Sequence, residues 1–379
     1  KTNLFEEETG GFRLYRIPGI VVTAKGTVLA YCEARKFSVA DRGEIEIHLR
    51  RSTDDGRTWD APRQIAHIGP RLPRNPHTPG GKSRRDFGGP DEQTVNNPMA
   101  IADRDGTVHF VYCVEYMRCF YMRSNDDGRT WSEPTEITAT FDRFRPDLDW
   151  QAIATGPGHG IQLHSGRLLV PVWLANYDKG VPLARASSAI YSDDGGETWQ
   201  RGELAILHSN EATAAELADG RVMFSARNDD PRRRRAVAHS RDGATAWSPT
   251  EYDEELLEPG CMASLLSCCA KPEDDRPLLL YSNPRTTSRE HRDRRNLTIH
   301  LSYDDGQTWP VRRALEPGPS AYSDLAVLPD GTLLCFYESG RGEEPHKSGR
   351  PWAYSFLTLA RFNLAWLTDS GTERGTNSP

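Results

Sequence analysis

The sequence predicts an all-β fold, a six-bladed β-propeller with four-stranded antiparallel blades. Three observations lead to it: a turn-rich composition, an octapeptide that recurs along the chain, and apolar hairpins that alternate with the octapeptide. The 379 residues include 32 Gly and 26 Pro, and long helical periodicity is scarce. Short strands between frequent turns are typical of sandwiches, barrels and propellers.

The octapeptide follows the pattern S-x-D-x-G-x-T-W. Its five copies, of which the fourth is degenerate, begin at Ser52, Ser124, Ser192, Ser240 and Ser302. The Asp side chain bonds its own backbone, the Gly supplies a positive φ and Thr-Trp opens a strand, so each copy predicts a tight β-turn. A calcium loop is the alternative interpretation, but the acidic spacing and final Glu of an EF-hand do not occur in the octapeptide.

Six segments consist of an apolar run, a turn and a second apolar run. They are Ile20–Cys32, Met99–Val114, Ile161–Leu174, Ala212–Ala226, Met262–Ser282 and Leu325–Tyr337. Five of them precede an octapeptide turn, and each such pair makes a four-stranded blade. We expect Tyr354–Asn363 and the segment Asn3–Glu6 to complete the sixth blade.

We expect these blades to form one domain over residues 1–367, followed by a polar, disordered tail at 368–379. Pro70–Glu92 is expected to be an insertion loop.

The bulk composition argues against several classes of function. Lys and Arg total 47 against 54 for Asp and Glu, and the net charge of −7 gives no electrostatic reason to expect nucleic acid or anionic membranes. No apolar stretch is long enough to span a bilayer. The 7 Cys are an odd number and do not suggest a disulfide framework, and no Cys or His spacing suggests a metal, so we expect no cofactor. The chain begins at Lys1 without Met or a signal peptide, so the sequence does not give the compartment; a secreted or periplasmic location is favoured if a leader was trimmed.

Hairpin geometry predicts which side chains meet. The first strand runs toward the turn Gly and the second runs back, so residues about nine before and about seven after that Gly share one end of the blade. Polar or ionisable residues occupy these positions in several hairpins: Arg16, Asn97, Glu211 and Tyr322 before the turn, and Glu33, Arg227 and Glu338 after it.

The third strand of a blade starts at this same end. Asp41 precedes the strand expected at Glu44–Arg51, and Arg294 precedes the strand expected at Leu297–Leu301. We therefore expect these polar residues to surround a pocket on the central axis of the ring.

The pocket chemistry suits an anionic substrate. Arg16, Arg227 and Arg294 would converge on one point, and guanidinium forks bind a planar carboxylate bidentately. The alternative, that each Arg only caps a strand or pairs with a surface acid, is favoured for any one Arg alone and not for three in matched positions.

Tyr322 and Glu211 occupy corresponding positions on different blades, so their side chains can approach each other across the axis. A phenol with an ordinary pKa of ~10 is a weak nucleophile at neutral pH, and a neighbouring carboxylate can take its proton. Asp41 could then protonate a leaving oxygen. Alternatively, Asp41 is a solvated loop acid and Tyr322 a core aromatic.

Four further motifs accompany the octapeptide turns, and together they resemble the exo-α-sialidases. They are Tyr15–Pro18 (YRIP), Ser225–Asn228 (SARN), Arg294–Leu297 (RRNL) and Ala321–Leu325 (AYSDL). The resemblance extends from about Arg13 to Trp366. It implies hydrolysis of terminal α-linked sialic acid from sialoglycoconjugates, with retention of configuration through a tyrosyl intermediate.

The resemblance also implies a role for individual residues. Tyr322 would be the nucleophile, Glu211 its base and Asp41 the acid/base. The substrate-binding set would be Arg16, Arg227 and Arg294 at the carboxylate, Arg35 and Asn97 at the C4 side of the sugar, with Glu338 orienting Arg16. Several arginines adjoin Arg294, and the Asn-Leu-Thr that follows, together with the distance to Trp309, selects it.

Two segments, His67–Gln93 and Phe141–Trp150, are expected to form the rim at the N-acyl and glycerol sides. Trp150 is either a wall of the pocket or a core residue. The competing functions are a hydrolase for a related nonulosonic acid such as the deaminated sugar, a trans-sialidase, and a sialic-acid-binding propeller without catalysis. The last would leave Tyr322, Glu211 and Asp41 free to vary.

Overall fold

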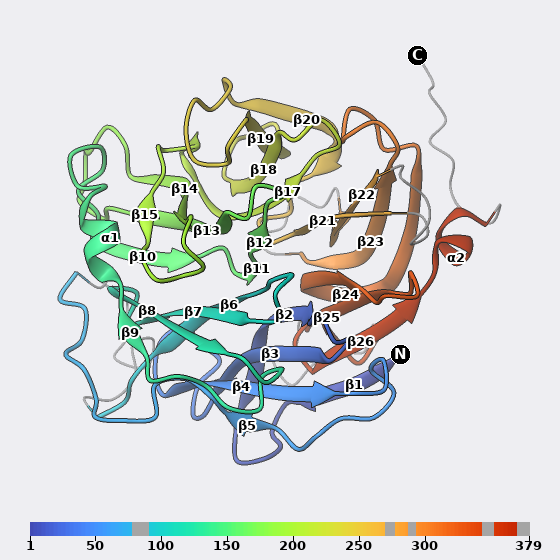
Figure 1. The fold of residues 1–379 in the computed structure, drawn as a ribbon, viewed down its shortest axis with the longest axis horizontal. Helices are drawn as coiled ribbons and strands as arrows, with labels where there is room; N and C mark the ends of the chain where they lie inside the picture. Colours follow the sequence, from blue (N-terminus) through green and yellow to red (C-terminus); the bar gives the residue numbers. More distant parts are fainter. Residues whose placement is uncertain (78–90, 270–276, 287–292, 343–351, 370–379) are drawn as a thin grey trace.

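The part of the chain that the structure describes forms five sheets, in which most neighbouring strands are antiparallel; they surround a common centre in an all-β, propeller-like arrangement (Figure 1). The computed structural model describes residues 1–77, 91–269, 277–286, 293–342 and 352–369. Part of the expected insertion loop, the turn expected at residues 271–276 and most of the predicted tail lie outside these residues. None of the helices in the described ranges is long and apolar enough to cross a membrane.

Four of the sheets contain four to six strands each. The first consists of β2 (Leu14–Val22), β3 (Val28–Arg35), β4 (Ile45–Ser52) and β5 (Arg63–Gln64). The second consists of β11 (Gly158–His159), β6 (Val95–Ala102), β7 (Val108–Val114), β8 (Arg118–Ser124) and β9 (Thr135–Glu136). The third consists of β10 (Ala152–Thr155), β12 (Ile161–Gln162), β13 (Leu168–Ala175), β14 (Arg185–Ser192), β15 (Gln200–Arg201) and β16 (Ile206–Leu207). The fourth consists of β17 (Ser209–Glu216), β18 (Val222–Asn228), β19 (Arg234–Ser240) and β20 (Glu251–Leu257).

The fifth sheet has seven strands and contains both ends of the described chain. Its order is β1 (Thr2–Glu6), β26 (Phe356–Phe362), β25 (Leu333–Ser339), β24 (Val311–Val327), β23 (Arg295–Ser302), β22 (Pro277–Pro284) and β21 (Ser264–Cys269). The pairing of β1 with β26 confirms that the N-terminal segment completes the last hairpin. Two short helices, α1 (Thr138–Asp142) and α2 (Leu364–Thr368), lie outside the sheets.

The structure therefore has five sheets where six separate blades were expected. The reason is β24, which is 17 residues long. Its first part pairs with β23 and its last part pairs with β25, so one continuous strand joins the two expected final blades.

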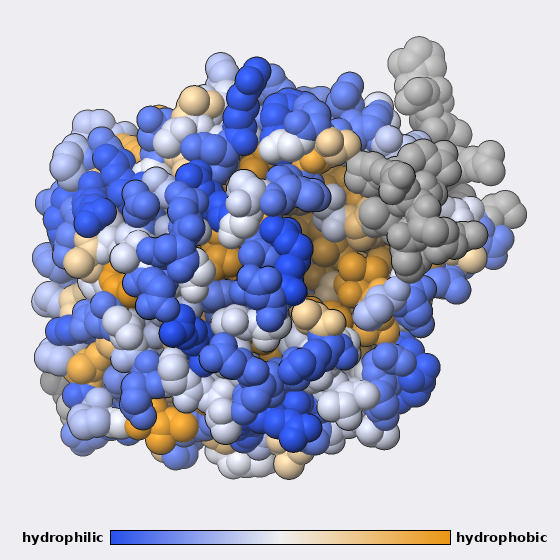
Figure 2. All heavy atoms as spheres, viewed as in Figure 1, coloured by the Kyte–Doolittle hydropathy of each residue, from blue (hydrophilic) through white to orange (hydrophobic). Residues whose placement is uncertain are grey.

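Apolar side chains fill the space between neighbouring sheets. One cluster joins the second and third sheets and includes Phe141, Phe144 and Trp150, all less than 5% exposed. The prediction that Phe141–Trp150 forms part of the pocket rim is thus wrong for these side chains, because they pack in the core. The face seen in Figure 2 is mostly hydrophilic, with apolar groups in the hollow to the right of the centre and in smaller patches elsewhere.

The octapeptide turns lie at the ends of the strands remote from the predicted pocket. In the first sheet, Val28 pairs with both Val22 and Ser52, so the hairpin turn and the octapeptide turn share one end, whereas Arg35 and Ile45 pair at the other end. This register confirms the predicted phase of the repeat.

Every copy of the octapeptide is closed in the same way. The Ser hydroxyl donates to the Asp carboxylate, and the carboxylate accepts from the Thr backbone three or four residues later; the Asp residues are Asp54, Asp126, Asp194, Asp242 and Asp304. The octapeptide Gly is needed for close packing as well as for its positive φ. At Gly128 (φ +73°), an added Cβ would lie 3.1 Å from the side chain of Leu29 on the preceding sheet. The octapeptide turn at Gly128 thus packs closely against the preceding sheet.

We expect Asp194→Asn to destabilise the protein in a pH-dependent way. Hydrogen bonds from Thr198 and then Ser192 lower the pKa of Asp194 from 3.8 to about 2. A lowered pKa contributes stability that is fully present above pH 3.8 and is lost as the pH falls through about 2. The urea midpoints of the variant and the wild type should therefore differ at neutral pH and converge in acid; a difference that does not change with pH would contradict this assignment.

A buried ion pair connects the innermost strands beneath the pocket. Asp324 on β24 pairs with His159 on β11 (Oδ1 to Nδ1, 2.7 Å), and it accepts from the backbone of Ile20 on β2 at 2.9 Å and from the hydroxyl of Ser264 on β21 at 2.8 Å. Burial lowers the pKa of His159, but Asp324 outweighs burial and raises it above 6.5. One carboxylate therefore holds segments from four strands in a fixed arrangement.

Candidate active site

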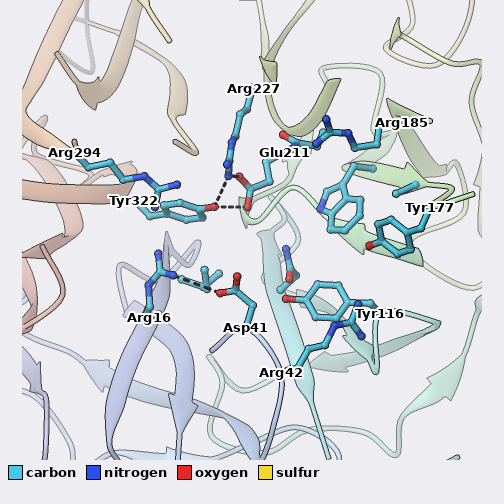
Figure 3. Close-up of a pocket in the computed structure, with 15 residues that line it drawn as sticks. Arg16, Asp41, Arg42, Tyr116, Tyr177, Arg185, Glu211, Arg227, Arg294 and Tyr322 are labelled. Carbon is cyan, nitrogen blue, oxygen red and sulfur yellow. Dashed lines mark hydrogen bonds and ion pairs between the residues drawn. The ribbon is translucent and has the colours of Figure 1, made fainter. Parts of the chain in front are cut away.

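A cavity of about 300 Å³ opens at the end of the strands opposite the octapeptide turns. Seven of the ten predicted site residues line it (Figure 3): Arg16, Asp41, Asn97, Glu211, Arg227, Arg294 and Tyr322. The other three, Arg35, Glu338 and Trp150, are buried and lie outside its lining. The structure thus brings together most of the site predicted from hairpin phase.

The same backbone irregularity presents four of these side chains. The register shifts at an irregularity in each of the innermost strands β2, β6, β17 and β24. Asn97, Glu211 and Tyr322 lie among the unpaired residues at these shifts, and Arg16 is the last paired residue before the shift in β2. Bulges bend a strand and redirect its side chains, and they are frequent beside active sites. Asn97 has a φ of +50° within its bulge, which is an unusual conformation for a residue other than Gly.

Tyr322 and Glu211 are in direct contact. The Tyr322 hydroxyl donates to Glu211 Oε1 at 2.5 Å, while Arg227 Nη1 donates to both the hydroxyl (3.0 Å) and Glu211 Oε2 (2.6 Å). Burial raises the pKa of Tyr322 well above 10.0, and Glu211 raises it further, while Arg227 and Arg294 lower it. The resting phenol is therefore protonated, with a carboxylate placed to remove its proton.

The three predicted arginines surround Tyr322. The guanidinium carbons of Arg16 and Arg294 lie 5.2 Å and 5.1 Å from the centre of its ring. Arg294 donates to the Tyr354 hydroxyl at 3.2 Å and to the Gly260 carbonyl. Guanidiniums from β2, from β18 and from the residue before β23 therefore point toward one region of the cavity (Figure 3).

Glu338 holds Arg16 in place, as predicted. Its carboxylate is fully buried and accepts from Arg16 Nε (2.9 Å) and Nη2 (3.1 Å). It also accepts from the backbone N–H groups of Ile17 (3.1 Å) and Tyr322 (3.0 Å). One carboxylate thus fixes a carboxylate-binding candidate and the backbone of the candidate nucleophile.

Asp41 lies on the opposite side of the cavity from Glu211 (Figure 3). Its side chain is 58% exposed, and its Oδ1 accepts from Arg35 Nη1 at 2.8 Å and from Arg16 Nη1 at 3.5 Å. A carboxyl group and a tyrosine–carboxylate pair therefore face one space from two sides, which suits acid–base chemistry at a bound substrate.

Comparisons with known proteins identify the family. Residues 83–335 match the family model of the BNR repeat-like domain. A sialidase-3 of Mus musculus is 30% identical over 90% of this chain and 91% of its own length. The chain belongs to the sialidase family.

Bacterial and structural relatives agree with this assignment. A sialidase of Micromonospora viridifaciens is 32% identical over 94% of this chain, and one of Bacteroides fragilis is 33% identical over 86%. The chain spans 52% and 60% of these two relatives' lengths. The solved structure of the Hadza microbial sialidase Hz136 is 28% identical, has a TM-score of 0.74 and is matched over 94% of this chain and 67% of its own.

One part of the lining of this sialidase-family site was not predicted from the sequence. That part is aromatic and basic, and is formed by Arg42, Tyr116, Trp173, Tyr177, Arg185 and Asn210. Arg185 opens β14, the third strand of its blade, so the rule that placed Asp41 and Arg294 could have found it. Tyr116 lies in the turn between β7 and β8 with a φ of +53°, which no motif in the sequence indicates.

We expect Arg294→Lys to weaken the binding of a carboxylate-bearing glycal inhibitor by about 10²-fold, because an ammonium group cannot pair bidentately with a carboxylate. The measurement is the inhibition constant against an aryl sialoside. Arg295→Lys is the matched control, since Arg295 donates to Asp293 at 2.7 Å and does not line the cavity. Equal losses in the two variants would contradict the assignment of Arg294.

Proposed function

We propose that this chain is an exo-α-sialidase that releases terminal α-linked sialic acid from sialoglycoconjugates with retention of configuration. The observation that carries the proposal is the contact between the Tyr322 hydroxyl and Glu211 Oε1 among three cavity-lining arginines. Family membership and the sialidase relatives support it.

Arg16, Arg227 and Arg294 would bind the substrate carboxylate. Burial lowers the pKa of Arg16, but Glu338, together with Tyr354 and Asp41, outweighs burial and raises this pKa well above its ordinary value, so the guanidinium stays charged inside the cavity. A substrate held in this way carries its negative charge next to the reacting carbon. That charge would repel a carboxylate nucleophile but would not repel a neutral phenol. A tyrosine therefore suits the role of nucleophile.

In the first step, Glu211 accepts the proton of Tyr322 as the phenol oxygen attacks the anomeric carbon. The bond from that carbon to the leaving oxygen breaks, and Asp41 donates a proton to the oxygen. In the second step, Asp41 takes a proton from water, the water oxygen displaces Tyr322, and Glu211 returns the proton to the phenolate. Two inversions at one carbon give net retention.

The experiment is a panel of N-acetyl, N-glycolyl and deaminated sialosides whose products are followed by NMR from the first turnover. Retaining hydrolysis releases the α-anomer first, before mutarotation. Release of the β-anomer first would exclude the two-step route. Binding of the sugars without any release would instead support a sialic-acid-binding propeller, and transfer to an added acceptor would identify a trans-sialidase.

We also propose that the seven-stranded sheet represents the fifth and sixth blades of a six-bladed propeller. In support, the partner of β24 changes from β23 at Pro319 to β25 at Ser320, and the register of β24 against β25 shifts just after this point, between Ser320 and Ser323. Five octapeptide turns and a ring closed by β1 fit the same count.

A further inference from the structure

Arg294 differs from the other two arginines of the site in its hydrogen-bond partners. Each of the other two pairs with a carboxylate, at 2.9 Å and 2.6 Å. Within the described ranges Arg294 pairs with no carboxylate: Nη1 donates to the Tyr354 hydroxyl at 3.2 Å, Nη2 donates to the Gly260 carbonyl, and Nε has no hydrogen-bond partner. The orientation of the Arg294 guanidinium therefore depends on two neutral acceptors.

Gly260 belongs to the connection between β20 and β21, and a buried carboxylate fixes the course of this connection. Glu258 Oε1 accepts from the backbone N–H groups of Gly260 at 2.7 Å and of Cys261 at 3.1 Å. Gly260 has a φ of +71°, and a Cβ built there would meet no heavy atom within 4 Å. The conformation of the turn is therefore set by hydrogen bonds, and not by packing around Gly260.

The peptide group between Gly260 and Cys261 connects Glu258 to Arg294. The carbonyl of Gly260 and the N–H of Cys261 belong to one planar unit and point in opposite directions. Glu258 binds this unit at its N–H, and Arg294 binds it at its oxygen. Hydrogen bonds that are linked in this way polarise and strengthen one another. The place of the Glu258 carboxylate therefore sets the place of the acceptor for Arg294.

A buried arginine fixes Glu258 in turn. Arg235 Nη1 donates to Glu258 Oε2 at 2.7 Å, and the two side chains are 0% and 2% exposed. The same Nη1 donates to the Cys261 carbonyl at 3.1 Å, while Nε and Nη2 donate to the hydroxyl and the carbonyl of Ser225 at 3.2 Å and 3.1 Å. Arg235 lies on β19 and Ser225 on β18, so the pair attaches the turn to two strands of the fourth sheet.

We infer that Glu258 and Arg235 are a positioning pair for Arg294, and that they act through the Gly260–Cys261 peptide group. Neither side chain lines the cavity. This inference rests on the proposed function, in which Arg294 binds the substrate carboxylate.

The indirect contact has an electrostatic consequence. A carboxylate in direct contact with a guanidinium offsets part of its positive charge. Glu258 is separated from Arg294 by a peptide group and is itself paired with Arg235. Arg294 is thus oriented by a carboxylate without being neutralised by it, and its charge remains available to an anionic ligand.

A buried ion pair can also contribute to stability alone, because loss of one partner leaves the other charge buried and unpaired. The two roles differ in what a substitution changes. A purely structural pair affects the melting temperature. A positioning pair also affects the affinity for a carboxylate, and only while Arg294 is present.

The test is a double-mutant cycle on the inhibition constant of a carboxylate-bearing glycal, measured well below the melting temperature of every variant. Glu258→Gln keeps the shape of the side chain and should weaken inhibition by about tenfold, because small errors in orientation are costly at a binding site. Arg294→Ala should weaken inhibition by at least about 10²-fold. Adding Glu258→Gln to Arg294→Ala should change the inhibition constant by less than about twofold, since the positioned group is then absent.

Asp103→Asn is the matched control for loss of a buried pair. Asp103 Oδ2 pairs with His109 Nε2 at 3.0 Å, and both are buried at the hairpin-turn end of β6 and β7, remote from the cavity. The substitution should lower the melting temperature and leave the inhibition constant within about twofold of the wild-type value. If Glu258→Gln does not fold, Arg235→Lys, which keeps the charge but not all of the hydrogen bonds, replaces it in the same cycle.

Three results would overturn the inference: additive losses in the cycle, an equal loss of affinity in Asp103→Asn, or an unchanged inhibition constant in folded Glu258→Gln. The cycle also separates the inference from the proposed function. If Arg294→Ala weakens inhibition and Glu258→Gln does not, only the positioning role fails. If Arg294→Ala leaves the inhibition constant unchanged, the carboxylate-binding assignment of Arg294 fails, and the positioning role fails with it.

Discussion

Tyr322→Phe is expected to lower kcat for an aryl sialoside by at least about 10³-fold, because the variant has no oxygen to form the glycosyl-enzyme bond. The ring, its burial and its contacts with Arg16 and Arg294 would remain. Steady-state kinetics measures the loss, and NMR follows the configuration of any residual product. Inversion in the residual turnover would agree with water attacking directly in the space left by the hydroxyl.

Tyr354→Phe is the matched control for this variant. Its ring packs against Arg16 at 4.2 Å, and its hydroxyl accepts from Arg294 at 3.2 Å, without contact to Glu211 among the described hydrogen bonds. We expect a loss of less than about tenfold, in line with one hydrogen bond to a charged group. A Tyr322→Phe variant with an unchanged rate and retained configuration would remove Tyr322 from the mechanism.

Glu338→Gln is expected to reduce the free energy of unfolding by about 3–5 kcal/mol, because the Arg16 guanidinium loses its buried counter-ion and keeps only the exposed Asp41 carboxylate at 3.5 Å. The Gln side chain also places an amide donor at one of the two oxygen positions, where Glu338 now accepts from either Ile17 or Tyr322. Urea denaturation measures the change in stability. Affinity for a carboxylate-bearing inhibitor should fall as well, since Arg16 loses its fixed orientation.

Glu254→Gln is the control for charge alone. That carboxylate is 79% exposed and lies 3.5 Å from Arg234, and exposed pairs of this kind contribute about 0–1 kcal/mol. If the two substitutions reduced the free energy of unfolding by similar amounts, burial of Glu338 would not be the reason for its contribution to stability.

The sequence predicts the site well where the hairpins repeat. A turn Gly fixes the phase of each hairpin, and counting from it placed Arg16, Glu211 and Tyr322 at one end of three different blades. The bulges that direct these side chains inward could not be predicted, since they depend on close packing around the axis. Counting was accurate enough because a bulge shifts the register by only a residue or so.

Outside the repeats the sequence was less informative. Trp150 belongs to a segment without periodicity, and only the structure shows it packed in the core with its Nε1 donating to the Phe141 carbonyl at 2.8 Å. The pairing of Arg35 with Glu33 could have been predicted from the sequence by a simpler argument. Side chains two residues apart share one face of a strand, so Glu33 and Arg35 could have been expected to pair.

The number of sheets was mispredicted for a related reason. Hairpin counting assumes that each blade begins on a new strand, but the connection from Glu316 to Ser320 stays extended within β24. No Gly-rich turn and no octapeptide separates the part of β24 that pairs with β23 from the part that pairs with β25. The repeat pattern therefore does not mark where one expected blade ends and the next begins.

The pairing of β1 with β26 has a consequence for the order of events during synthesis. Asn3 and Thr358 are hydrogen-bonded across a separation of 355 residues. At ribosomal rates the first strand would therefore wait about 20 to 70 s for its partner to be made. During that interval the ring is open, with the edges of β1 and of its future neighbours unpaired and able to recruit another chain. Ring closure by β1 and β26 is thus a late step in the folding of the chain.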